Sequence, residues 1–531
     1  MIVRVSDVPV DWIELRSPVA VADEDLTLCD KYVPQRSMKS IEPRTSQSHP
    51  LQIAEIAAGA GYGLVGLTLC PGKKQTAALT GAWDRDLALD LDAVQAWNAS
   101  VVVTLVEEHE LERLQVSGMG HAVRNRHIEW LHLPIRDRGV PGAAFEAAWD
   151  KVGEGLRARL RNGFNVLVHC MGGLGRAGTI ASRLLVELGW TPEDAVRRVR
   201  RVRPGAIETD QQLAFVHGFR AVPEHVPDDS AASIRDRALG ALLGLAVGDA
   251  LGTTLEFSTR DIHPRLTDMV GGGPFRLKPG QWTDDTSMAL ALADSLASCG
   301  GLDERDLMSR FVRWMDEGAY SSNGRCFDIG MTVRGALTRF KQTGNPVAGS
   351  TDPMSAGNGS LMRLAPVAIR YWDDRETMRD AAARQSLTTH GAAEAVDACV
   401  AFADMLADAI AGSPRSEVFR ARVDRTCAIH LIIAGSWRGK SRSAIKSSGY
   451  VAHSLEAAIW CVARTDSFAD AVLLAANLGD DADTVAAITG QLAGGMYGTS
   501  GIPKRWVELI ACGQKIEDAA ARLFEASGPT S

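Results

Sequence analysis

The sequence contains no long hydrophobic run. In 531 residues, no uninterrupted apolar segment approaches the ~20 residues that an α-helix needs to cross a bilayer. The N-terminus, MIVRVSDVPVDWIELRS, carries an acidic or basic side chain every few positions, which excludes a signal-peptide core. We therefore expect no membrane partner and predict a cytoplasmic location.

Cysteine pairs and an excess of basic residues are also missing. The nine cysteines form no C-x-x-C pair and no Cys/His zinc spacing, so neither a disulfide framework nor a zinc site is predicted. The formal net charge of −8 argues against extended contact with a nucleic-acid backbone, which requires many Lys and Arg side chains. A nucleic acid is therefore expected as a substrate only through a modified end.

The length of the chain and a change in its composition and hydrophobic spacing indicate two domains. A chain of 531 residues exceeds the ~250–300 at which a single hydrophobic core stops growing. Short β-rich runs at 100–106, 130–134 and 165–169 are each followed by helical spacing, which predicts an α/β domain with a mostly parallel central sheet. Beyond residue 231, Ala, Leu and Gly recur at three- and four-residue spacing, which predicts an all-α helical bundle. The predicted division is an N-terminal extension over 1–50, the α/β domain over 51–222, a linker over 223–231 and the helical domain over 232–531.

The first motif follows the apolar run that ends at residue 169. There the chain reads His-Cys170-Met-Gly-Gly-Leu-Gly-Arg176, and a helical pattern begins at once. A strand–loop–helix of this kind directs backbone N–H groups at one point, which makes an anion site. The same field lowers the pKa of a cysteine thiol and favours the nucleophilic thiolate. The alternative is a glycine-rich turn around a buried cysteine. The predicted phosphate cradle consists of Cys170, Gly172, Gly173, Gly175 and Arg176.

This motif resembles the signature loop of the dual-specificity phosphatases, most closely the kinase-associated phosphatase group. The resemblance extends over about residues 50–220 and includes the segments 67–71, 134–141 and 206–212. It implies hydrolysis of phosphomonoesters through a phosphocysteine, with Asp137 as general acid and Gln212 placing water; Asp137 could alternatively be a solvated loop acid. Ala177 stands where the family usually has Ser or Thr, which predicts a slower second step.

The second motif consists of two acidic clusters far apart in the sequence. One reads Thr283-Asp-Asp-Thr286 and the other Gly479-Asp-Asp-Ala-Asp-Thr484. Carboxylates and hydroxyls without nearby Cys or His suit hard cations such as Mg²⁺ or Mn²⁺. For either cluster alone, a helix N-cap is the alternative interpretation.

Together with their surroundings, these clusters resemble the ADP-ribosylglycohydrolase family. The resemblance covers about residues 235–510, and it is closest to the bacterial branch that includes the dinitrogenase reductase-activating glycohydrolase. It implies two bound Mg²⁺ or Mn²⁺ ions and catalytic carboxylates at Glu256 and Asp328, whereas Asp480 is left out of the site. The implied metal-binding residues are Thr283, Asp284, Asp285, Asp481, Asp483 and Thr484.

Further residues are candidates for binding ADP-ribose. Gly357, Asn358, Gly359 and Ser360 form a turn whose N–H groups suit pyrophosphate or ribose, although a helix-terminating loop is the alternative. His390 is a candidate for a distal-ribose contact, or an ordinary polar residue. Tyr450 is a candidate platform for adenine, or a core residue.

The predicted function is therefore that of a bifunctional hydrolase. One domain would cleave the C1″ glycosidic bond of an ADP-ribosylated protein or small molecule, and the other would hydrolyse a phosphorylated substrate. The alternative is that one domain is a catalytically weak reader of ADP-ribose or phosphate that recruits the other.

Overall fold

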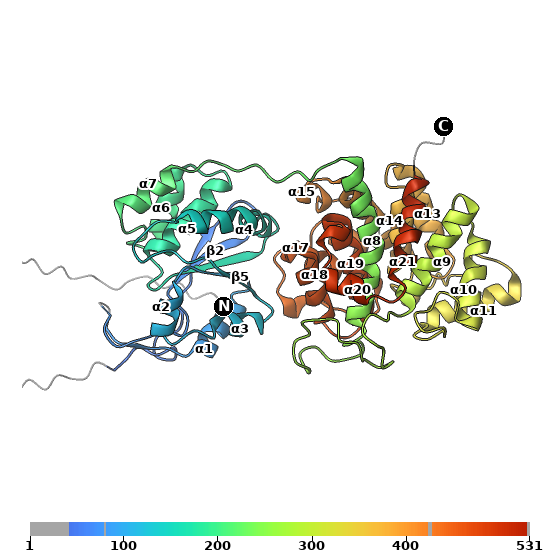
Figure 1. Ribbon diagram of the computed structural model, residues 1–531, viewed down its shortest axis with the longest axis horizontal. Helices are drawn as coiled ribbons and strands as arrows, with labels where there is room; N and C mark the ends of the chain where they lie inside the picture. Colours follow the sequence, from blue (N-terminus) through green and yellow to red (C-terminus); the bar gives the residue numbers. More distant parts are fainter. Residues whose placement is uncertain (1–41, 79–80, 423–426, 528–531) are drawn as a thin grey trace, which may run out of the picture. The chain divides into compact units, whose positions relative to one another are not determined.

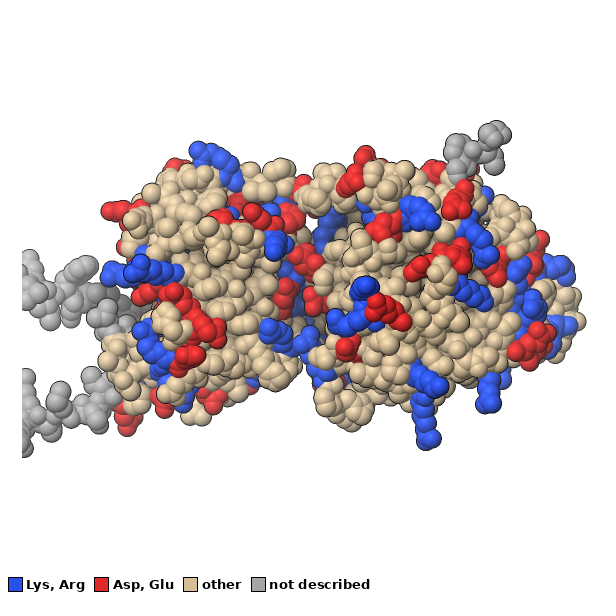
Figure 2. Space-filling model, in the orientation of Figure 1, with Lys and Arg blue, Asp and Glu red and all other residues tan. Residues whose placement is uncertain are grey.

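The computed structural model describes residues 42–78, 81–422 and 427–527 (Figure 1). The predicted N-terminal extension lies mostly outside the described residues. Within them, no helix is long and apolar enough to span a bilayer. On the face shown in Figure 2, acidic and basic side chains of the described residues lie interspersed.

The N-terminal domain is built on a five-stranded sheet of order β1-β2-β7-β5-β6. Only β1 and β2 pair in antiparallel fashion, and the three remaining pairs are parallel, which confirms the mostly parallel sheet. Val-rich β5 is buried along its whole length because helices cover both faces of the sheet. The strands are β1 (Ala54–Ala57), β2 (Leu64–Thr68), β5 (Ala99–Thr104), β6 (Glu129–His132) and β7 (Asn165–His169), and a small hairpin joins β3 (Lys74–Gln75) to β4 (Trp83–Asp84).

Two apolar clusters flank this sheet. One contains side chains of α4, α5, α6 and α7, and the other contains side chains of α1, α2 and α3. Figure 1 shows these two groups of helices on opposite sides of the sheet. Every residue of α5 is buried, so the segment that follows the cysteine loop is held inside the domain. The helices are α1 (Leu87–Ala96), α2 (Glu108–Arg113), α3 (Met119–Arg124), α4 (Ala143–Arg161), α5 (Gly175–Glu187), α6 (Pro192–Val202) and α7 (Asp210–His217).

The second domain is helical, as predicted. Residues 219–229 form neither helix nor strand, and α8 begins directly after Ser230, whose side chain caps it. The longer helices are α8 (Ala231–Gly252), α9 (Asp284–Cys299), α10 (Glu304–Glu317), α11 (Met331–Thr343), α13 (Arg375–Leu387), α14 (Ala393–Ala411), α17 (Val451–Arg464), α19 (Ala482–Tyr497) and α21 (Gly513–Glu525). The shorter ones are α12 (Ala365–Arg370), α15 (Arg415–Val418), α16 (Cys427–Ile433), α18 (Phe468–Ala476) and α20 (Lys504–Leu509).

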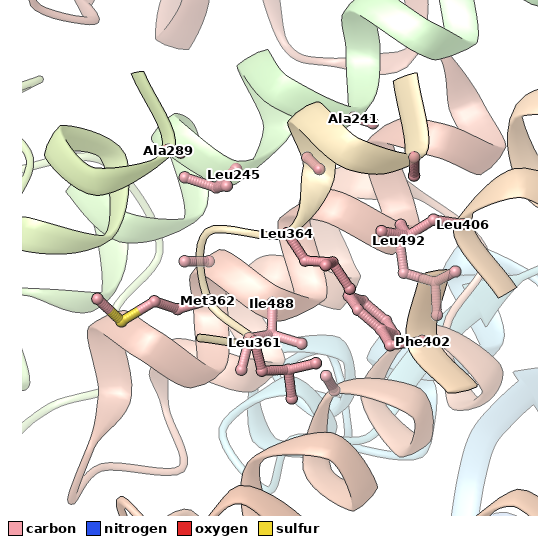
Figure 3. Close-up of a cluster of buried hydrophobic side chains, with 14 of the residues drawn as sticks. Ala241, Leu245, Ala289, Leu361, Met362, Leu364, Phe402, Leu406, Ile488 and Leu492 are labelled. Carbon is pink, nitrogen blue, oxygen red and sulfur yellow. The ribbon is translucent and has the colours of Figure 1, made fainter. Parts of the chain in front are cut away.

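Helices α8 and α19 pack backbone to backbone at the centre of this domain. A Cβ added at Gly244 would lie 2.3 Å from the carbonyl oxygen of Gly490, and one at Gly248 would lie 2.1 Å from that of Ala486. Side chains are therefore excluded at these positions, because the two helices could not otherwise approach so closely. Figure 3 shows Leu245 and Leu492 in the apolar core around this pair. The rigid pairing places the C-terminal end of α8 beside the N-terminal end of α19, where the acidic residues lie.

Two candidate active sites

The cysteine loop connects β7 to α5 and forms a cradle of free N–H groups. Cys170 is 4% exposed, at the floor of the loop. Arg203 donates hydrogen bonds to the carbonyl oxygens of Gly172 (2.8 Å) and Gly173 (3.0 Å). Within the described residues, the N–H groups of residues 171–176 donate no hydrogen bond to a protein acceptor. The loop therefore presents donors and a buried thiol to the same space, as an anion site requires.

The glycines of the loop differ in what they permit. Gly173 has φ +70°, and a Cβ there would lie 2.4 Å from the carbonyl oxygen of Thr68. A Cβ at Gly175 would meet the Glu208 carboxylate at 2.3 Å, whereas one at Gly172 would point into open space. Gly173 is thus required by its backbone conformation and by packing, whereas a Cβ at Gly175 would displace the exposed Glu208 side chain and Gly172 leaves room in front of the loop.

Arg176 is held in place by a buried carboxylate that the sequence did not single out. Its two Nη atoms donate to the Glu110 carboxylate at 2.5 and 3.1 Å, and Nη1 also donates to the Ile135 carbonyl oxygen at 3.0 Å. Both side chains are almost fully buried. Burial alone would raise the pKa of Glu110, but the hydrogen bonds from Arg176 and from the Glu107 N–H hold it below its ordinary value. The weak signal in the sequence is the capping box that Glu107 and Glu110 form at α2.

Asp137 lies at the rim of this site. Its side chain is 58% exposed, and its Oδ1 is 3.0 Å from Nη2 of Arg176. With Met171 it lines a cavity of about 680 Å³ that extends away from the cysteine loop. Gln212 is buried; it donates to the Gly139 carbonyl oxygen (3.1 Å) and accepts from the Glu208 N–H (2.9 Å). Gln212 thereby holds the loop that carries Asp137.

The hydroxyl next along α5 is turned away from the thiol. Thr179 Oγ1 donates to the carbonyl oxygen of Gly175 at 2.9 Å, within its own helix. Ala177 is fully buried and offers no hydroxyl. The described site thus holds no substitute for the Ser or Thr that the resemblance leads one to expect after Arg176.

In the helical domain, Asp249 on α8 fastens the N-terminal end of α9. Its Oδ1 accepts hydrogen bonds from the N–H (2.8 Å) and hydroxyl (2.9 Å) of Thr283. Its Oδ2 accepts from the N–H (3.0 Å) and hydroxyl (2.7 Å) of Thr286. Asp249 lies inside the glycine-rich segment of the sequence, but its role depends on the contact between α8 and α9. It positions the first acidic cluster.

The two acidic clusters meet in space. One carboxylate oxygen from each of Asp249, Asp285 and Asp483 lies within 4.8 Å of the others, and the same holds for Glu256, Asp328 and Asp483. Within the described residues, Oδ1 of Asp285, Oδ1 of Asp483 and Oε2 of Glu256 are buried without a hydrogen-bond partner. Burial and mutual repulsion raise the pKa values of Asp285 and Asp483 well above normal. Burial, and secondly the negative charge of Asp328, raises the pKa of Glu256 to about 9. Unpartnered oxygens in a like-charged cluster fit hard divalent cations.

The remaining predicted metal-binding residues lie around this centre. The Thr283 hydroxyl is 3.2 Å from Asp285 and 3.3 Å from Asp483. Asn358 donates to the Asp481 carboxylate at 2.5 Å, which links the second cluster to the glycine turn. Asp284 and Thr484 line the cavity in front of the cluster. Asp480 is exposed and does not line it.

The cavity measures about 250 Å³ and has an acidic wall and a backbone wall. The acidic wall contains Glu256, Asp328 and Asp481, and the facing wall contains residues 357–359 and His390. His390 hydrogen-bonds through Nδ1 to Thr389 Oγ1 (2.9 Å), and its Nε2 faces the glycine turn. Burial lowers the pKa of His390 to about 3, so the ring is neutral at pH 7.

Two predicted binding residues lie outside the cavity lining, and several residues that were not predicted lie within it. Ser360 is buried and hydrogen-bonds to Ser386 (2.8 Å), while the Tyr450 hydroxyl donates to Glu394 (2.6 Å). Phe257 and Met331 line the cavity although they are 69% and 92% exposed. Nothing in a sequence distinguishes an apolar side chain that is exposed from one that is buried.

Comparisons with known proteins assign a family to each of the two domains. The family model described as ADP-ribosylglycohydrolase matches residues 230–531, and the one described as a Swiss Army Knife protein, DSP-PTPase phosphatase domain, matches residues 84–216. The chain is 50% identical over 292 residues to the ADP-ribosylarginine hydrolase Tri1 of Serratia proteamaculans, covering 54% of this chain and 79% of the relative. It is 34% identical over 302 residues to the ADP-ribosyl-[dinitrogen reductase] glycohydrolase of Rhodospirillum rubrum, covering 55% and 96%. The chain is also 29% identical over 187 residues to rat cyclin-dependent kinase inhibitor 3, covering 34% of this chain and 83% of the relative. The chain therefore belongs to the ADP-ribosylglycohydrolase family, with a dual-specificity-type phosphatase domain preceding the hydrolase domain.

Proposed function

We propose that the helical domain releases ADP-ribose from modified arginine side chains with the help of two Mg²⁺ or Mn²⁺ ions. The observation that supports metal binding is the set of unpartnered, buried carboxylate oxygens of Glu256, Asp285 and Asp483. The choice of arginine is supported by the 50% identity to an ADP-ribosylarginine hydrolase. The ions would be held by Thr283, Asp284, Asp285, Asp481, Asp483 and Thr484. Such ions polarise oxygen ligands and orient ribose hydroxyls and water.

Each wall of the cavity has a proposed task. One carboxylate oxygen of Glu256 lies within 4.8 Å of one of Asp328 at the acidic wall, where these groups would move the proton that cleavage at C1″ requires. The N–H group of Gly359 and the His390 ring would bind ribose or pyrophosphate, since the N–H groups of Gly357 and Asn358 already donate to the carbonyl oxygens of Ser355 and Gly449. Phe257 offers an exposed aromatic face to the adenine beside the cavity, a task that the sequence alone assigns to Tyr450.

The test is release of free ADP-ribose from ADP-ribosylated arginine and serine peptides, in Mg²⁺, Mn²⁺ or EDTA. We expect release from the arginine peptide that depends on the metal. The matched control is Asp480→Asn, which removes an exposed acid next to the cluster and should leave the rate unchanged. Equal release in EDTA would contradict the proposal of metal dependence, and release from serine alone would contradict the proposed substrate.

We further propose that the N-terminal domain hydrolyses phosphomonoesters through Cys170. The thiolate would attack phosphorus while the bond to the leaving oxygen breaks and Asp137 protonates that oxygen. Water placed with the help of Gln212 would then attack phosphorus, and the S–P bond would break. Arg176 and the free N–H groups of residues 171–176 support this proposal, because they match the charge of the phosphoryl oxygens.

Cys170→Ser should abolish phosphate release from aryl phosphates, whereas Cys512→Ser, at an exposed cysteine, should not. A phosphorylated protein trapped by acid quench in the wild type but absent in Cys170→Ser would identify the intermediate. The missing hydroxyl after Arg176 favours a second candidate function, that of a phosphate reader. Phosphate binding without turnover in the wild type would support the reader and contradict the phosphatase.

A further inference from the structure

A third cavity, of about 260 Å³, shares no lining residue with either candidate active site. Its walls come from residues 100–130 of the α/β domain and from Arg265, the end of α17 and α18 of the helical domain. Three arginines line it, Arg124, Arg265 and Arg464, together with two carboxylates. The cavity belongs to neither proposed reaction.

Arg464 is a buried cation without a carboxylate partner. It is 5% exposed; Nη2 donates to the Ala99 carbonyl oxygen at 2.7 Å, and the guanidinium lies over the rings of Phe164 and Trp460. Among the described residues, no acidic side chain forms an ion pair with Arg464, and its Nη1 has no hydrogen-bond partner. Burial lowers the pKa of Arg464 to about 9. A guanidinium buried in this way is costly unless an anion compensates it.

Arg265 adds a second uncompensated cation. It is half-buried, and its Nε is buried with no hydrogen-bond partner in the described part of the chain. Burial lowers the pKa of Arg265. Asp470 is the one acid within the described ranges that raises this pKa, and it does so without forming an ion pair with Arg265. Arg124 completes the arginine group, with its guanidinium over the Trp130 ring at 5.0 Å.

The two carboxylates of the cavity are engaged elsewhere. Glu129 forms an ion pair with Arg159, and Asp470 accepts hydrogen bonds at the start of α18 from the Ser467 hydroxyl (2.7 Å). Neither carboxylate therefore accepts a hydrogen bond from the Nη1 of Arg464 or the Nε of Arg265, two nitrogens that are themselves buried.

We propose that this cavity binds a phosphate group, with Arg464 and Arg265 as the principal donors. Guanidinium groups match the oxygens of phosphate in geometry and charge, and a dianion would compensate both orphaned cations. The phosphate can come from inorganic phosphate or from a nucleotide that carries a diphosphate, since both present the same oxygens. The proposal does not depend on the activity of either catalytic site.

The test is isothermal titration calorimetry of inorganic phosphate into the full chain carrying Cys170→Asp. That substitution places a carboxylate at the floor of the cysteine loop, which repels phosphate there. Ionic strength is held constant with chloride. We expect one phosphate to bind, and Arg265→Gln to weaken its binding at least ~10-fold, as expected for a charge-assisted hydrogen bond. Arg464→Lys, which keeps the charge, should weaken it by a similar factor because the fork of donors is lost.

The matched control is Arg305→Gln, at an exposed arginine on α10, which should bind phosphate as before. Saturating ADP-ribose that abolishes phosphate binding would identify the nucleotide as the source of the phosphate, and undisturbed binding would identify free phosphate. If calorimetry detects no phosphate binding, the cavity holds only water and the proposal is overturned. Equal binding by Arg265→Gln and the parent would overturn it as well.

Discussion

The two candidate active sites differ in how their buried charges are compensated. In the phosphatase site, the buried cation Arg176 is neutralised by the buried carboxylate of Glu110. In the glycohydrolase site, the buried acids face one another, and no Lys or Arg among the described residues forms an ion pair with them. Those acids are Asp249, Glu256, Asp284, Asp285 and Asp483.

This difference shows how far each site is organised before its ligand arrives. The cysteine loop has its arginine oriented and its N–H groups free, so phosphate can bind with little rearrangement. The acidic site contains repulsion that only protons or cations relieve. Its stability should therefore depend on metal concentration, whereas the phosphatase site should be indifferent to it.

The largest expected effect comes from Asp483→Asn, which removes the carboxylate common to both acidic groups. We expect ADP-ribose release to fall ~10- to 100-fold, since metal sites lose that much when a supporting group is removed. In EDTA the same variant should melt at a higher temperature than the wild type, because one repulsive charge is gone. At a metal concentration of 100 Kd the wild type should gain about 2.7 kcal/mol of stability, and the variant much less. Calorimetric melting with and without Mn²⁺ measures both; a lower melting temperature of the variant in EDTA would show that Asp483 stabilises the fold by more than its repulsion costs.

A second effect is expected at the paired site from Glu110→Gln. The amide keeps the shape of the carboxylate but leaves the Arg176 cation buried without its counter-charge. We expect kcat/KM for phosphate esters to fall ~10- to 100-fold, and phosphate binding to change less than turnover. Glu108→Gln, at an exposed acid on the same helix, is the control. ADP-ribose release from the same protein should be unaltered, and a parallel loss there would indicate general unfolding.

The sequence predicts what is contiguous and misses what packing brings together. The strand before Cys170 and the spacing from Cys170 to Arg176 lie in one segment, so both the fold class and the cradle could be inferred. Glu110 and Asp249 act on segments that are distant in the chain, and only the folded structure shows their partners. Ser360 has a suitable side chain, but packing turns it toward Ser386. The short strands β1, β3 and β4 have too few residues for a periodic pattern.

The next effect concerns pH and is common to both domains. Burial lowers the pKa of His169 to about 3, as it does for His390. Below an unfolded-state pKa of about 6.5, the unfolded chain binds a proton that the native His169 does not, so the free energy of unfolding falls as pH falls from 6.5 toward 3. Between pH 7 and pH 5, His169 should lower the free energy of unfolding by about 2 kcal/mol. Urea unfolding of His169→Asn should show a correspondingly smaller loss over this range, whereas His225→Asn, at an exposed histidine, should behave as the wild type.

The smallest expected effect tests whether the phosphatase domain is slow because of one missing hydroxyl. Ala177→Ser restores a hydroxyl directly after Arg176, where it can stabilise the departing Cys170 thiolate in the second step. We expect kcat to rise a few-fold, on the order of one hydrogen bond, while the initial burst of product stays the same. Thr179→Val is the matched control, because that hydroxyl already donates to Gly175 and should not contribute. A burst followed by a steady rate that Ala177→Ser accelerates would place the slow step in hydrolysis of the phosphocysteine. If Ala177→Ser changes neither phase, the second step is limited elsewhere, and the contrast between the two sites concerns charge alone.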